Sequence, residues 1–136
     1  MNVPDPNPDG AHWLRYARED LAEAERMLTV SSSVPRHACY LAQQAAEKAL
    51  KTVLIYLRLD YPFSHNLNLI RDLIPAGWPL KVAHPNLGGL TAWAITSRYP
   101  TDVPDATIDD AWAACGQARA VLESVTSDLR DHGFPA

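Results

Sequence analysis

The chain has 136 residues, of which 47% are hydrophobic, so one compact domain with an apolar core is expected. Its formal net charge of −4 excludes a surface that is basic throughout, and any site for nucleic acid must therefore be local. Cys39 and Cys115 have no CxxC spacing and no secretory leader precedes them, which indicates a reduced, cytoplasmic protein. The longest strongly apolar run, residues 53–57, is far too short to cross a membrane.

The chain opens with a segment rich in Pro, Asp and Asn. Residues 1–9 are therefore predicted to be a flexible tail, followed by a single domain over residues 10–132. Apolar residues spaced by three and four positions from Leu14 to Leu28 predict an amphipathic helix over about residues 10–29. Charged residues fill the positions between them, so one face of this helix is expected to be buried.

A second helix is predicted from Pro35 to about Arg58, with Ser33 as its N-cap and Pro35 in its first turn. One stripe along this helix consists mainly of small side chains: Cys39, Ala42, Ala46, Ala49, Val53 and Leu57. Small side chains let a neighbouring helix approach closely, so we expect a tight helix-to-helix contact here.

A short helix opening at Ser64 is predicted over residues 64–74, and Pro75-Ala76-Gly77 ends it. Residues 78–85 are predicted to connect this helix to the next one. Residues 86–97 can form a further helix, although Gly88 and Gly89 weaken its first turn.

The last helix is predicted to start after Thr107 as its N-cap, with Asp109 and Asp110 near its positive end. Apolar residues recur at spacings of three and four from Ile108 to Leu129. No segment alternates with the two-residue period of a strand. The predicted fold is therefore all-α, an antiparallel up-and-down bundle of four main helices plus a short fifth.

A polar band lies beside the alanine stripe of the second helix. Gln44, Lys48 and Lys51 follow one another at i, i+4 and i+7, and two lysines with an amide on one ridge can hold a phosphate. The alternative is a solvated face with a Glu47–Lys51 ion pair, which composition alone favours.

Metal and cofactor sites are not expected from the sequence. The five histidines show no i, i+3 or i, i+4 pairing with one another: His12, His37, His65, His84 and His132. Signatures of serine hydrolases, phosphate loops and dinucleotide-binding folds are absent. We therefore predict neither a metal nor a cofactor.

Three motifs in order resemble those of the HEPN domains, small helical bundles of bacteria and archaea. Residues 40–50, YLAQQAAEKAL, are similar to the family's second-helix signature. Residues 64–67, SHNL, resemble its THDL turn, and residues 94–100, AITSRYP, resemble its ARYP element. With an amphipathic first helix and a long last helix, the resemblance covers about residues 10–131.

The resemblance implies a protein that dimerises and is often encoded beside a minimal nucleotidyltransferase. Some family members are RNases, typically toxins of toxin–antitoxin pairs, with an Arg-x4–6-His motif near the start of a late helix. Arg98 lies in the corresponding element, but Val103, Pro104 and Asp105 occupy the positions where the histidine is required. A formal Arg-x6-His from Arg58 to His65 lies between the second and third helices, and we interpret it as coincidental.

These residues favour a non-catalytic or catalytically degenerate HEPN protein in a two-gene, toxin–antitoxin-like system. We expect a cytoplasmic homodimer with a minimal nucleotidyltransferase as its partner. A nucleotide or an RNA phosphate is predicted to bind through Gln44, Lys48, Lys51, Arg98 and Tyr99. The tyrosine either stacks a base or covers the end of the bundle.

Two alternatives stay open. In the first, the protein is a metal-independent RNase toxin in which Arg98 works with a histidine from another segment or subunit, His65 or His37. In the second, it is a purely structural helical dimerisation module that binds no phosphate. His65 itself is predicted to cap or pin the turn before the third helix.

Overall fold

The computed structural model describes residues 8–100 and 102–136, which form six α-helices and no strand. In chain order the helices are α1 (Pro8–Met27), α2 (Pro35–Tyr56), α3 (Leu67–Leu73), α4 (Leu80–Ala83), α5 (Gly88–Thr96) and α6 (Ile108–Asp131). The all-α prediction is confirmed. Residues 1–7 of the expected tail lie outside the described residues, while residues 8 and 9 form the start of α1. No described helix is long and apolar enough to cross a bilayer.

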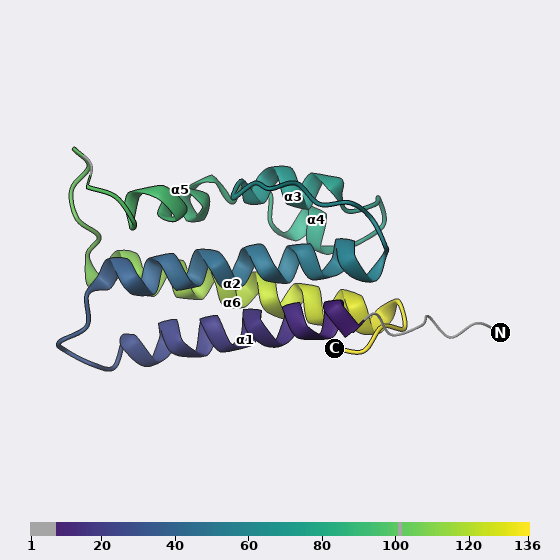
Figure 1. The fold of residues 1–136 in the computed structure, drawn as a ribbon, viewed down its shortest axis with the longest axis horizontal. Coiled ribbons are helices and arrows are strands. Elements are labelled where there is room, and N and C mark those ends of the chain that lie inside the picture. The colour runs from purple at the N-terminus through teal and green to yellow at the C-terminus, as the bar shows by residue number, and fades with distance from the viewer. Residues whose placement is uncertain (1–7, 101) are drawn as a thin grey trace.

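The helices follow an up-and-down path. Helix α1 runs in one direction, α2 returns, the segment from α3 to α5 runs back, and α6 returns parallel to α2 (Figure 1). Helix α2 lies centrally and contacts α1, α6, α3 and α5. The third position of the bundle is therefore filled by short helices rather than by one long helix. The interruption follows the sequence, because Pro75, Pro79 and Pro85 lie there together with Gly77, whose φ of 93° suits a glycine.

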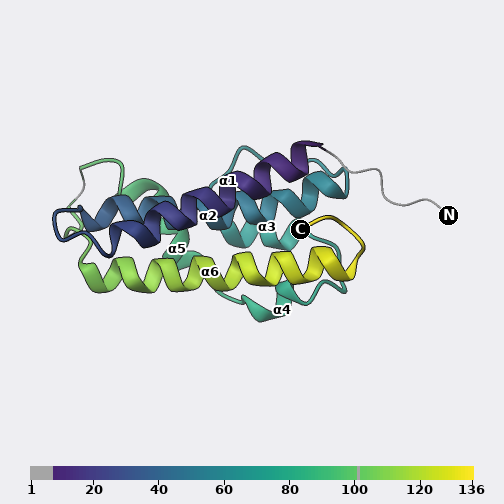
Figure 2. The same cartoon turned by 90° about the horizontal axis from the view of Figure 1, so that it is seen from below.

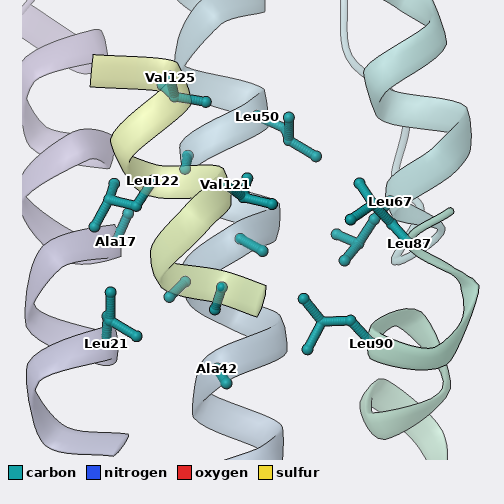
Figure 3. Close-up of a cluster of buried hydrophobic side chains, with 14 of the residues drawn as sticks. Ala17, Leu21, Ala42, Leu50, Leu67, Leu87, Leu90, Val121, Leu122 and Val125 are labelled. Atoms are coloured by element: carbon teal, nitrogen blue, oxygen red, sulfur yellow. The ribbon is translucent and has the colours of Figure 1, made fainter. Parts of the chain in front are cut away.

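The core is built around the small side chains of α2. Cys39, Ala42, Ala46, Ala49 and Val53 are wholly buried. Figure 3 shows apolar side chains reaching this region from both sides: Ala17 and Leu21 from α1, Val121, Leu122 and Val125 from α6, and Leu67, Leu87 and Leu90 from the α3–α5 side. Methyl-sized side chains on α2 let the larger residues of its neighbours fill the space between the helices.

The starts of the long helices agree only in part with the predictions. Thr107 caps α6 as expected, and it forms a capping box in which the Thr107 hydroxyl and the Asp110 carboxylate each accept from the other's backbone N–H. The prediction that Ser33 caps α2 is wrong, because Val34 occupies the N-cap and no side chain caps this end. Pro35 holds the residue before it in an extended conformation, which places the cap one residue later than expected.

Helix α3 begins later than predicted. Asn66 is its N-cap, and the Asn66 side chain accepts a hydrogen bond from the backbone N–H of Leu69 at 3.3 Å. The Ser64 hydroxyl instead accepts from the backbone N–H of Asn66 at 3.1 Å. Ser64 therefore shapes the turn before the helix rather than the helix start.

The predicted connector, residues 78–85, contains the one-turn helix α4, which no sequence pattern indicates. Its position is set by α6. The buried carboxylate of Asp128 accepts a hydrogen bond from the backbone N–H of Leu80 at 2.8 Å, and the His84 ring lies 2.8 Å from the Ser124 hydroxyl. Burial lowers the pKa of His84, which favours its neutral form in this contact.

If close packing along α2 holds the bundle together, enlarging a stripe residue should destabilise it. The Ala46→Leu variant is expected to lower the free energy of unfolding by about 1–3 kcal/mol, because the added atoms find no room. Urea denaturation followed by circular dichroism at 222 nm measures the change. Ala120→Leu, on the exposed face of α6, is the matched control, and equal losses in the two variants would contradict the close packing.

Candidate functional site

The residues predicted to bind a ligand lie in two separate places. Arg98 and Tyr99 follow α5 and lie at the end of the bundle where α2 begins, and Arg98 lies over the ring of Tyr40. Gln44, Lys48 and Lys51 lie further along α2. Tyr40 and Lys51 are eleven residues apart on this helix, or about 16 Å along its axis. The structure therefore does not bring the three predicted cations together.

Lys48 joins α2 to α1. The Lys48 ammonium donates a hydrogen bond to the carboxylate of Asp20 and forms an ion pair with it. Both side chains are only partly exposed. The charge of Lys48 is thus compensated by a neighbouring helix.

Lys51 is enclosed. The residue is 5% exposed, and Nζ donates to Oε2 of the equally buried Glu47 at 3.1 Å. Nζ also lies 5.5 Å from the ring centroid of Tyr61 and 6.0 Å from that of Trp13, within the range of a cation–π contact. The Glu47–Lys51 pair of the alternative prediction therefore forms, but inside the protein and not on a solvated face.

The remaining polar residues of α2 fasten the loop before α3. Gln43 is wholly buried and donates to the backbone carbonyl of His65 at 3.1 Å, while the His65 Nδ1 lies 2.7 Å from Oε1 of Glu47. Gln44 donates to the Gln43 side chain at 2.7 Å. Every buried side-chain N or O atom of the described residues has a hydrogen-bond partner. Gln44, Lys51 and His65 thus belong to one polar network with Gln43 and Glu47, which we call the Glu47 network.

Arg98 is placed differently. Its guanidinium carbon lies 5.4 Å from the ring centroid of Tyr40 and 5.5 Å from that of Tyr99. Within residues 8–100 and 102–136, Arg98 forms no ion pair with a carboxylate. Two aromatic rings orient the guanidinium without neutralising it, so its charge is available to a ligand.

Two adjoining hollows, of about 450 and 420 Å³, surround Arg98. Arg36, Ser97 and Arg98 line both, and His37 lines the first. Asp105 is the one carboxylate among the described residues lining them. We call the two together the Arg98 hollow.

Little in the sequence indicates this grouping. Arg36 belongs to none of the predicted motifs, and His37 enters the predictions only as a partner of Arg98 in an RNase. Both lie in the first turn of α2, whose N-terminal end carries a partial positive charge and has no side-chain cap. No local spacing links them to Arg98, because the contact depends on how α5 ends against the start of α2.

The described residues contain no group of three or more His, Cys, Asp or Glu side chains placed to hold a metal ion. Cys39 and Cys115 are both buried thiols. Burial raises the pKa of Cys39 to about 12 and that of Cys115 to about 11, so both are protonated at neutral pH.

Known proteins resemble this chain in sequence and in fold. Residues 11–129 match the family model of the HEPN domain. The crystal structure of TT1696 from Thermus thermophilus is similar, with 28% identity, a TM-score of 0.72, and coverage of 88% of this chain and 98% of that one. The archaeal HEPN homologue ST0689 is 25% identical, with a TM-score of 0.67 and coverage of 88% and 97%. No curated protein matches the chain.

The Glu47 network should behave as part of the core. Glu47→Leu leaves the Lys51 ammonium buried without its carboxylate, and is expected to lower the free energy of unfolding by about 3–5 kcal/mol. The double variant Glu47→Leu/Lys51→Met removes both charges and is expected to recover much of that loss. Urea unfolding of the two variants and the wild type measures the difference. A double variant no more stable than Glu47→Leu alone would contradict a structural role for the pair.

Proposed function

The chain belongs to the HEPN domain family, and on this basis we propose that it is a non-catalytic member that binds a nucleotide or an RNA phosphate in the Arg98 hollow. The observation that carries the proposal is that Arg98 and Arg36 both line the same hollow. Neither arginine forms an ion pair with any described carboxylate.

The chemistry of the hollow suits a nucleotide. A guanidinium offers two parallel N–H groups to a phosphate, and two arginines from different elements can contact it from two sides. Tyr99 is 57% exposed beside them, and an exposed aromatic ring can stack on a base. The uncapped start of α2 adds partial positive charge. In a chain of net charge −4, this cluster supplies the local positive site that an anionic ligand needs.

The proposed biological setting is a two-gene, toxin–antitoxin-like system in the cytoplasm. There the protein works as a homodimer with a minimal nucleotidyltransferase as its partner. Family membership and the RYP sequence at residues 98–100 support this setting. The Arg98 hollow is open at the surface, so it can be reached by a ligand that the partner also handles.

Two observations support the non-catalytic role. No histidine follows Arg98 at the spacing of the RNase motif. His65 is one of the two histidines considered as a partner of Arg98 in an RNase. It belongs to the Glu47 network and contacts Glu47, in the part of α2 away from Arg98. This contact leaves it with a structural role at the turn before α3.

A second candidate function rests on His37, which lines the same hollow as Arg98. In a metal-independent RNase, a histidine takes the proton from the 2′-hydroxyl while an arginine stabilises the charge that develops on the phosphate. His37 and Arg98 are of the right types for these two roles.

Binding should depend on both arginines of the hollow. Arg98→Ala and Arg36→Ala are each expected to weaken binding of a fluorescently labelled single-stranded RNA about ten-fold, the effect of losing a charge-assisted contact. Fluorescence anisotropy at constant ionic strength measures the affinity. Arg15→Ala, on the exposed face of α1, removes the same charge elsewhere and is expected to change the affinity little. Equal weakening by all three substitutions would point to nonspecific attraction instead.

Incubation with labelled RNA in EDTA separates the two candidate functions. The non-catalytic proposal expects intact RNA with the wild-type protein. Cleavage by the wild type that disappears in both Arg98→Ala and His37→Ala, but persists in His65→Ala, would establish the RNase instead. Circular dichroism of each variant checks that it remains folded.

A further inference from the structure

The Arg98 hollow consists of two halves that share their positive charges. Arg36, Ser97 and Arg98 line both halves. The half of about 450 Å³ also reaches Tyr40 on α2, and the half of about 420 Å³ reaches Tyr99 in the segment after α5. We call them the α2 half and the α5 half. Figure 2 shows that the start of α2 and the end of α5 lie toward the same end of the bundle, where a turn joins α1 to α2.

Each half has one aromatic ring next to Arg98. The guanidinium carbon of Arg98 lies 5.4 Å from the ring centroid of Tyr40 and 5.5 Å from that of Tyr99, so the cation contacts both rings. Tyr40 is partly exposed and Tyr99 is 57% exposed, and each ring is open to a ligand in the half that it lines. Unpaired bases stack on aromatic rings with little dependence on their sequence. The hollow therefore offers one stacking surface in each half, with a cation beside both.

Apolar side chains form much of the remaining lining. Met27 and Leu41 lie in the α2 half, and Pro100, Val103 and Pro104 lie in the α5 half. Such side chains suit the flat face of a base, whereas a phosphate group gains nothing from them. The phosphate of a ligand is therefore expected at the boundary of the two halves, where both arginines lie, with a base on each side of it.

The charges of the hollow support this division. Arg36 and Arg98 form no ion pair with a carboxylate of residues 8–100 and 102–136, and Asp105 is the one carboxylate of the described lining, so the hollow is positive overall. Asp105 lines the α5 half alone. A carboxylate accepts hydrogen bonds from the hydroxyl groups of a ribose or the N–H groups of a base, and it repels a phosphate. The α5 half therefore suits a nucleoside rather than a second phosphate.

We propose, resting on the function proposed for this hollow, that its ligand is one dinucleotide step of single-stranded RNA. The phosphodiester lies between Arg36 and Arg98, and one nucleoside occupies each half, with its base against Tyr40 or Tyr99. Each half lies in the size range of pockets for small organic ligands, so it has room for a nucleoside. A mononucleotide fills one half and leaves the other empty. The bases of a duplex stack on one another, so a duplex cannot offer two bases to the two rings.

Titration of the full ¹⁵N-labelled chain with the dinucleoside monophosphate ApA, and separately with AMP, tests the proposal by NMR at constant ionic strength. ApA is expected to bind about ten-fold more tightly than AMP, because it stacks a second base. Charge alone predicts the opposite order, since AMP carries more negative charge than the single phosphodiester of ApA. Tyr99→Leu should bring the affinity for ApA close to that for AMP. Tyr99 is exposed, so the remaining amide signals report whether the fold is kept.

The matched control is Tyr16→Leu, which removes an exposed tyrosine that also lies beside an arginine, Arg15 of α1, and should leave binding of ApA unchanged. Equal affinities for ApA and AMP, both weakened by Arg98→Ala, would overturn the dinucleotide inference and leave the proposed function standing. ADP binding as tightly as ApA would also overturn the inference, because a second phosphate would then occupy the α5 half. Binding of neither ApA nor a longer single-stranded RNA would overturn the proposed function and the inference together.

Discussion

The close approach of helices to α2 is the constraint on which the rest of the structure depends. Its stripe of alanines and Cys39 is wholly buried, which lets α1 and α6 pack against one side and the α3–α5 segment against another. A helix surrounded in this way has little surface left for solvent. Polar residues along α2 must therefore find partners inside the protein, as Gln43 and Glu47 do.

The same constraint separates the cations of the protein into two kinds. Lys48 and Lys51 lie where α2 is covered, and each is matched by a carboxylate, Asp20 or Glu47. Arg98 lies beyond the end of α5, where this helix no longer covers α2. It contacts aromatic rings instead of a carboxylate of the described residues. A charge held in place but not neutralised is suited to bind a ligand, whereas a buried paired charge is suited to hold a fold together.

Much of the fold could be predicted because it is local. Spacings of three and four fix the long helices, and Thr107 with Asp110 forms a cap from neighbouring residues. What could not be predicted depends on contacts between distant segments. The spacing of Gln44, Lys48 and Lys51 describes a ridge, but only the folded chain shows that Tyr61 and Trp13 enclose Lys51. Likewise, helix α4 requires the carboxylate of Asp128 on α6, which no local pattern signals.

The central claim is that ligands bind at the Arg98 hollow and not along the Gln44–Lys51 ridge. Mapping the backbone amide shifts of the wild-type protein during titration with a short single-stranded RNA tests it most directly. We expect the shifts to gather at residues 36–40 and 97–105, with residues 43–51 unchanged. Shifts that centre on residues 43–51 would contradict the claim, because the Glu47 network would then open to bind the ligand.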